Sequence, residues 1–140
     1  MAKSVLATKS LAFAIKVVSC VKSLQNEKHE MIMSKQILRS GTSIGANIHE
    51  ALYAQSKADF VSKLNISLKE ASETSYWLTL LEKTDYLSQT EYKSMKADVD
   101  ELMRMIIASL KTVRNNEKTS IESEMDNGSD TVHYSLFTIL

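Results

Sequence analysis

Residues 37–50 read Ile-Leu-Arg-Ser-Gly-Thr-Ser-Ile-Gly-Ala-Asn-Ile-His-Glu, and this stretch decides the fold. At 100° per residue, Ile37, Ile44 and Ile48 fall on one face together with both glycines, as in an amphipathic helix. Glycine inside a helix costs up to about 1 kcal/mol relative to alanine. Two glycines on the apolar face are therefore expected only where a neighbouring backbone comes close. The pattern extends over about residues 27–54 and predicts a long, closely packed helix.

Three further segments have the same helical period of apolar residues, over about residues 4–24, 57–82 and 89–113. The linkers between them are only a few residues long, so successive helices should be antiparallel neighbours. The sequence therefore predicts an all-α, up-down-up-down four-helix bundle. The expected starts of the last two helices carry a capping-box pattern and its variant, at Ser88–Glu91 and Ser56–Asp59.

Two of these helices are apolar on more than one side. In the first helix, Leu11, Ile15 and Val18 widen the apolar arc beyond a single stripe. In the third helix, a second stripe lies roughly opposite the main face, where a small bundle should be polar. Each feature indicates an additional packing partner. The candidate oligomer-interface residues of the third helix are Ile66, Trp77, Leu80 and Leu81.

The charge is divided unevenly along the chain. The whole sequence of 140 residues holds 17 basic and 17 acidic side chains. Residues 1–114 carry an excess of basic side chains, and residues 115–140 carry an equal excess of acidic ones. We therefore expect a bundle domain over 1–114 and an acidic, disordered tail over 115–140. The apolar end of that tail, His133–Leu140, is either a docking segment or an appendix without a role.

Composition excludes several classes of protein. The absence of proline and the presence of only three glycines argue against an all-β fold, which needs turn residues. The single cysteine, Cys20, excludes an internal disulfide and a thiolate-rich metal site. It is typical of a reducing compartment, and with no apolar run long enough to cross a membrane we expect a cytoplasmic protein with no membrane partner.

The sequence contains no constellation typical of an enzyme. The histidines His29, His49 and His133 are scattered, and His49-Glu50 lacks the second histidine of the zinc-protease helix motif. There is no glycine-rich phosphate loop and no pair of carboxylates with a mechanistic partner. We therefore expect no catalytic residues, no metal, no cofactor and no small-molecule substrate.

The run from Arg39 to Glu50 resembles the signature of a bacterial four-helix-bundle family whose first members are encoded in intervening sequences of large-subunit ribosomal RNA genes. The resemblance covers about residues 10–114 and continues through Ser56-Lys-Ala-Asp-Phe60. It departs from the family at residues 49–51, where His-Glu-Ala replaces the common Ala-Glu-Gly. It departs again at Ala54 and Gln55, which replace the usual arginines. Matching positions further along are Leu64, Ile66, Leu68, Ala71, Glu73, Leu81, Tyr86, Leu87 and Tyr92.

The resemblance implies a ring-shaped homopentamer. A similar protein is the accessory subunit of diversity-generating retroelements, a basic pentameric barrel that binds its reverse transcriptase and nucleic acid. Arg39, Asn47 and Glu50 are the polar members of the signature, with either a structural or a partner-binding role. Arg39 and Glu50 could pair across a subunit interface.

Two hypotheses follow for the function. The first is a non-enzymatic homo-oligomeric assembly or adaptor protein. The second is an accessory protein that binds RNA or a nucleoprotein such as a reverse transcriptase, through basic stripes that could track phosphates. The candidate basic residues are Lys28, Lys35 and Arg39 on the second helix segment and Lys93, Arg104 and Lys111 on the fourth.

Overall fold

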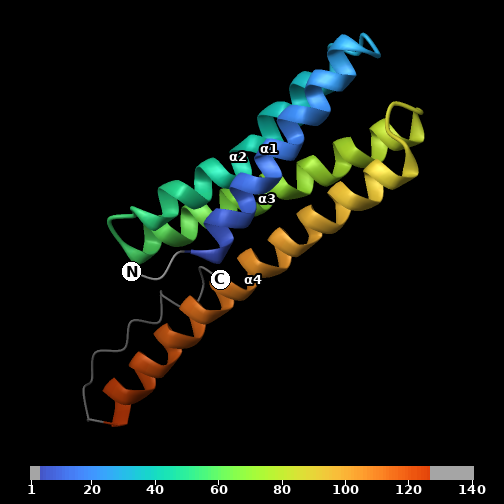
Figure 1. Ribbon diagram of the computed structural model, residues 1–140. Coiled ribbons are helices and arrows are strands. Elements are labelled where there is room, and N and C mark those ends of the chain that lie inside the picture. The colour runs from blue at the N-terminus through green and yellow to red at the C-terminus, as the bar shows by residue number, and fades with distance from the viewer. Residues whose placement is uncertain (1–3, 127–140) are drawn as a thin grey trace.

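The computed structural model describes residues 4–126, which form four helices and no strand (Figure 1). Successive helices run in opposite directions, so the predicted all-α four-helix bundle is confirmed. Each helix packs against its neighbours in sequence, and the first also packs against the fourth, which leaves the first and third at opposite corners. The helices are α1 (Val5–Asn26), α2 (Met33–Leu52), α3 (Lys57–Lys83) and α4 (Gln89–Asp126).

Serine side chains cap the N-termini of three of the helices. Each accepts a hydrogen bond from a backbone N–H that has no partner inside the helix. Ser4 Oγ accepts from the Ala7 amide at 3.1 Å at the start of α1. Ser56 Oγ accepts from the Asp59 amide at 3.1 Å at the start of α3. At α4, Ser88 Oγ accepts from the Glu91 amide while Glu91 Oε1 accepts from the Ser88 amide, which is a complete capping box.

One continuous apolar core joins all four helices. Phe13 of α1, Ile44 of α2, Leu78 of α3 and Val99 of α4 are each at most 2 % exposed. These residues follow the three-and-four spacing that the sequence shows, so the predicted core faces are confirmed. No helix of the described residues combines the length and the apolar character needed to cross a membrane.

Helices α1 and α2 approach closely at the two glycines of the signature. A Cβ atom at Gly41 would lie 2.8 Å from Val17 Cγ2, and one at Gly45 would lie 3.3 Å from Ser10 Oγ. The space that a larger side chain would fill is therefore occupied by α1. This confirms the expectation that a close neighbour compensates for the poor helix propensity of glycine.

Small polar side chains line the contact between α2 and α3. Thr74 Oγ1 donates to Ser40 Oγ at 2.9 Å, and Ser67 Oγ donates to the Ile44 carbonyl at 2.9 Å. All three hydroxyl side chains are fully buried. Because each finds a partner, this polar seam avoids the cost of an unpaired buried group and fixes how α2 sits against α3.

The second helix begins later than the sequence pattern predicts, at Met33 instead of about residue 27. Glu30 is buried at 7 % exposure, and its carboxylate accepts from the amides of Ile32 and Met33 at 3.0 Å and of Ser34 at 2.7 Å. His29 adopts a positive φ of 56°, which turns the chain before this cap. Residues 27–32 are therefore a capped turn instead of the first helical turns.

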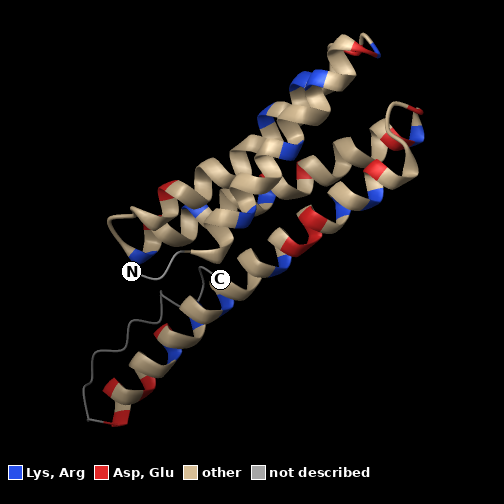
Figure 2. Cartoon of the chain, viewed as in Figure 1, with Lys and Arg blue, Asp and Glu red and all other residues tan. Residues whose placement is uncertain are grey.

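The expectation of a disordered tail from residue 115 is wrong for residues 115–126, since α4 continues to Asp126. Glutamate, lysine and methionine in this stretch favour a helix even without a regular apolar stripe. The extension projects past the other helices (Figure 1), and its basic side chains give way to acidic ones toward the end (Figure 2). Residues 127–140, including the segment His133–Leu140, lie outside the described residues.

Candidate assembly and partner surfaces

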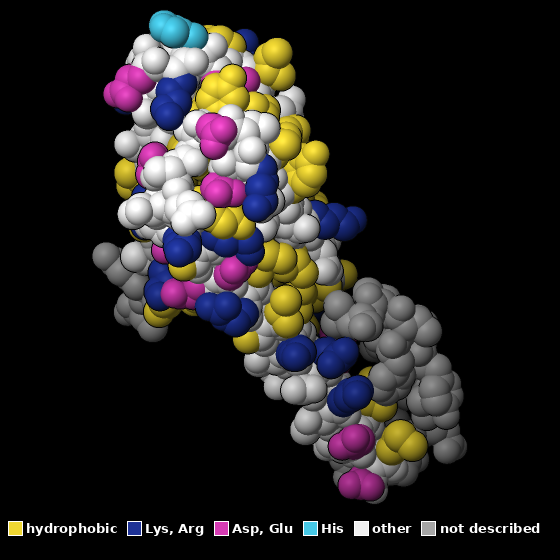
Figure 3. Space-filling view, turned by 90° about the vertical axis from the view of Figure 1, so that its right-hand side faces the viewer, with side chains coloured by type: hydrophobic (Ala, Val, Ile, Leu, Met, Phe, Trp, Pro, Cys, Tyr) yellow, Lys and Arg dark blue, Asp and Glu magenta, His cyan; other side chains and the backbone are white. Residues whose placement is uncertain are grey.

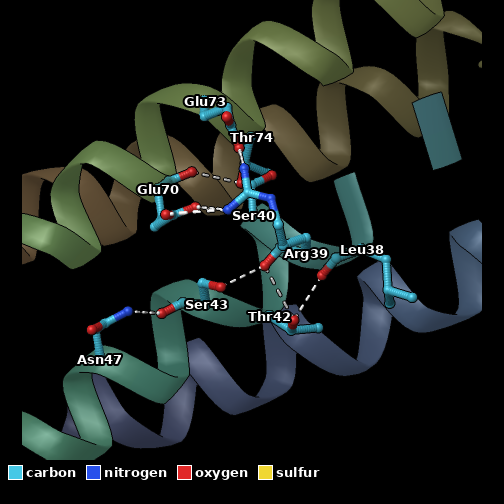
Figure 4. Close-up of polar contacts among 9 residues, drawn as sticks. All are labelled: Leu38, Arg39, Ser40, Thr42, Ser43, Asn47, Glu70, Glu73 and Thr74. Atoms are coloured by element: carbon cyan, nitrogen blue, oxygen red, sulfur yellow. Dashed lines mark hydrogen bonds and ion pairs between the residues drawn. The ribbon is translucent and has the colours of Figure 1, made fainter. Parts of the chain in front are cut away.

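Arg39 belongs to an ion-pair cluster that joins α2 to α3 (Figure 4). Its Nη1 lies 3.2 Å from Glu70 Oε2, and its Nη2 donates to Glu73 Oε2. The guanidinium spans two carboxylates one helical turn apart on α3. Arg39 is thus occupied within its own chain, which favours the structural role over nucleic-acid contact.

The other polar residues of the signature also find partners within the chain. Asn47 Nδ2 donates to the Ser43 carbonyl at 2.8 Å on its own helix. Lys63 Nζ of α3 lies 3.1 Å from Glu50 Oε2. Arg39 and Glu50, which could pair across a subunit interface, thus each have an ion-pair partner on α3 of the same chain.

The outward side of α1 is apolar and exposed. Leu11 is 64 % exposed, Ile15 is 63 % exposed and Val18 is 38 % exposed. They lie within one turn or two of each other on the side of α1 that points away from the core. We call these three residues the α1 face. Isolated exposed apolar residues are normal on monomeric proteins, so an aligned group of this kind is a candidate contact surface.

A groove runs beside the α1 face, between α1 and α2. It has a volume of about 470 Å³ and is lined by small residues such as Ala7, Ala14, Gly45 and Ala46. Leu11 and Ala14 also line a shallower hollow further along the outward side of α1, together with Ile15 and Val18. The α1 face is therefore uneven, with hollows that side chains of a partner could fill.

The structure divides the predicted second stripe of α3. Leu81 is fully buried in the core, so its assignment to an oligomer interface is wrong. Trp77 packs against the core at the α2 side of α3, and Leu80 is partly buried, whereas Ile66 is 39 % exposed. The stripe is broad because the helix packs against two neighbours, and only its outer edge faces away from the bundle.

Sequence reasoning missed Tyr76, which is 60 % exposed and lies next to Leu80 on the helical wheel, on the side away from Ile66. Its ring meets Trp77 edge to face, with 5.1 Å between the centroids. The signal was present in the sequence as an aromatic residue beside the predicted stripe. We call Ile66, Tyr76 and Leu80 the α3 face.

The basic residues predicted on the fourth helix lie on its outer side. Lys93, Arg104 and Lys111 are all exposed and form no ion pair within residues 4–126. We call these three residues the α4 stripe. Figure 3 shows further Lys and Arg side chains on the projecting lower part of the molecule, with acidic side chains at its end.

Other lysines of the bundle, unlike those of the α4 stripe, form ion pairs within residues 4–126. Lys9 pairs with Glu101, and Lys16 Nζ lies 2.6 Å from Asp98 Oδ2, so both hold α1 against α4. The hydrogen bond from Lys9 and then its positive charge lower the pKa of Glu101. Lys28 is exposed within the capped turn, and Lys35 is exposed in the first turn of α2.

The remaining reactive side chains give no indication of chemistry. Burial, and to a smaller extent the charge of Glu91, raises the pKa of the Cys20 thiol to about 11, so it is protonated and unreactive at neutral pH. Within residues 4–126, no group of three or more His, Cys, Asp or Glu side chains could hold a metal ion. His133 lies outside the described residues.

The fold and these surfaces define a small antiparallel four-helix bundle that leaves apolar helix faces open to solvent. Residues 3–108 match the model of the 23S rRNA-intervening sequence protein family, and the chain belongs to that family. It is similar to a crystal structure, at 1.70 Å resolution, of a protein of unknown function from the S23 ribosomal protein family of Bacteroides thetaiotaomicron VPI-5482. The TM-score is 0.76 and the identity is 55 %, over 76 % of this chain and 99 % of that one. A comparison with curated proteins finds no match.

Proposed function

We propose that this chain is a non-enzymatic assembly protein that forms a homo-oligomer and presents the resulting surface to a partner. The observation that carries the proposal is the α1 face, where three aligned apolar side chains are exposed. Burying apolar surface contributes about 25 cal/mol per Å², so a second copy that covers this face gains free energy that the monomer lacks. The family resemblance implies five copies arranged in a ring.

The α1 face gives a direct test of the assembly. Ile15→Glu places a charge in the middle of the face, and burying an unpaired charge is costly, so the variant should sediment as a monomer. The matched control is Ile107→Glu, because Ile107 is 38 % exposed on α4, which lies outside the proposed contact. Both variants should keep the helicity of the unmodified chain. An oligomer of unchanged mass for Ile15→Glu would contradict the proposal.

A second candidate function is that of an RNA-binding or nucleoprotein-binding accessory. It is favoured by the α4 stripe, whose three cations are exposed and have no carboxylate partner within residues 4–126. Symmetry would repeat this stripe in every copy of an oligomer. No aromatic side chain lies within the stripe, so the expected contacts are with phosphates instead of stacked bases.

Salt dependence distinguishes this candidate from a neutral adaptor. Binding to structured RNA should weaken steeply between low and moderate salt, since each neutralised phosphate contributes a slope of roughly −0.9 in log K against log salt for a duplex. Replacing both Arg104 and Lys111 by Gln should reduce binding and flatten the slope. Replacing Lys57 and Lys83, which are exposed elsewhere, removes the same charge and serves as the control. Failure to retain RNA at low salt would exclude the RNA-binding candidate.

A further inference from the structure

The α1 face and the α3 face point away from each other. Helices α1 and α3 occupy opposite corners of the bundle, separated by α2 and α4. Each carries apolar side chains on its outward side, with Ile15 63 % exposed on one and Tyr76 60 % exposed on the other. One chain therefore presents exposed apolar side chains on two opposite sides.

We infer that the α3 face of one copy packs onto the α1 face of the next copy, an inference that rests on the proposed assembly. A contact between two different surfaces is heterologous, so every copy has one face of each kind to offer. Such contacts close into a ring when the rotation between neighbours allows it. An α1-to-α1 contact would instead be isologous and would leave the α3 face uncovered.

The heights of the two faces along the bundle support this pairing. The close approach of Gly45 to Ser10 and the hydrogen bond from Ser67 to the Ile44 carbonyl place Ser10 and Ser67 at one level. In the same way, Gly41 links Val17 to the level of the Ser40–Thr74 hydrogen bond. The two helices thus stay in register along the bundle.

The register brings corresponding apolar residues to the same level. A helix rises 1.5 Å per residue, so Leu11 lies within roughly 3 Å of the height of Ile66, and Val18 lies within the same distance of the height of Tyr76. Cyclic symmetry relates neighbouring copies by rotation without a shift along the axis. When the helices run along that axis, Leu11 therefore faces the partner's Ile66, and Val18 faces the partner's Tyr76.

The size of the surface is adequate for a specific contact. Helix α1 has 22 residues and is about 33 Å long. A strip of that length and two helix diameters wide, including the groove wall of α2, covers roughly 700 Å², close to the ~800 Å² per partner of a standard interface. The shallow hollow lined by Ile15, Val18 and Lys22 lies at the height of Val18 and provides space for the ring of Tyr76.

Mixing two charged variants tests this pairing. Ile15→Glu spoils the α1 face and keeps the α3 face, whereas Tyr76→Glu does the reverse. Each variant alone should be monomeric by light scattering. An equimolar mixture should form a 1:1 dimer, because one intact face of each kind remains, and the dimer cannot grow because its outer faces are charged. Both side chains are exposed, so neither change should disturb the fold, which circular dichroism checks.

The outcomes separate this inference from the proposed function. If the unmodified chain is itself monomeric, the proposed assembly fails. If the unmodified chain assembles but Tyr76→Glu keeps the full mass, assembly stands and the α1–α3 pairing is overturned. The pairing is also overturned if both variants are monomeric and their mixture remains monomeric. Ile107→Glu is the control, because it leaves both faces intact. It should behave as the unmodified chain does, both by itself and when it takes the place of the unmodified chain in a mixture.

Discussion

Gly41 shows how one residue determines the distance between two helices. Alanine would improve helix propensity by up to about 1 kcal/mol, but its Cβ would lie 2.8 Å from Val17 Cγ2 on a stiff, β-branched side chain. Overpacking a well-filled core costs typically about 1–3 kcal/mol, so the clash outweighs the gain. Gly41→Ala should therefore lower the free energy of unfolding, measured in urea.

Gly45→Ala is the matched comparison, because its new Cβ would meet Ser10 Oγ at 3.3 Å, which a small shift relieves. Its stability should stay within about 1 kcal/mol of the unmodified chain. Adding Val17→Ala should recover part of the loss at Gly41, as a double-mutant cycle measures. Equal effects of the two glycine substitutions would refute the close approach at Gly41.

Glu30 makes stability depend on pH at a single residue. Burial by itself raises the pKa of this carboxyl, but hydrogen bonds from the amides of Ser34, Met33 and Ile32 outweigh it, and the pKa is lowered in the folded chain. A lowered folded-state pKa contributes stability above the unfolded-state pKa, and this contribution is lost as the pH falls through the folded-state value. The capped turn should therefore weaken in acid.

Glu30→Gln should cost about 1 kcal/mol at neutral pH, because it removes a charged cap, and much less in acid, where the carboxyl of the unmodified chain is protonated. Urea unfolding at both pH values measures the difference. Glu27→Gln is the control, since Glu27 is exposed in the same turn. A loss that is equal at neutral and acid pH would show that the charge of Glu30 does not act as a cap.

At the scale of the element, α4 consists of a packed part and a projecting part. Its contribution to the core comes from residues between Met95 and Ile106, whereas the family match ends at residue 108. Ending the chain after Arg114 should therefore leave the urea midpoint nearly unchanged while the helical signal in circular dichroism decreases. A large drop in the midpoint would show that residues 115–140 stabilise the bundle.

The elements were predictable wherever a local rule determines them. The apolar period and the caps at Ser56 and Ser88 identify four helices and most of the core. The start of α2 was missed because it is capped by the carboxylate of Glu30, which accepts hydrogen bonds from the amides of the following residues. This kind of cap has no Ser-x-x-Glu pattern that the sequence would reveal. The end of α4 was missed because its last turns follow helix propensity and not apolar spacing.

The surfaces were less predictable than the core. A helical wheel places Leu81 on the second stripe of α3, but Leu81 is buried in the bundle. Whether a side chain at the edge of a stripe is covered depends on how the packed helix is rotated about its axis, which the wheel does not show. The ion pairs of Arg39 join residues that are far apart in sequence, so charge patterns along one helix do not reveal them. By contrast, the wide apolar arc on α1 already indicated the additional partner that we now propose.

At the scale of the whole molecule, the zero net charge of the chain results from a basic bundle and an acidic end, and most of that acidic end is now assigned to the last turns of α4. Its ordered part cannot cover the bundle freely as a disordered tail would. The three basic side chains of the α4 stripe are exposed in the part of the chain that the structure describes. Assembly is the step on which the whole account depends.

The most direct test of that step is the mass of the unmodified chain in solution, measured by light scattering over a range of protein concentrations. We predict one species at an integral multiple of the 15.7 kDa monomer, with five copies implied by the family resemblance. The mass should persist on dilution and at high salt, because apolar faces hold the copies together. A single species of 15.7 kDa at all concentrations would contradict the account.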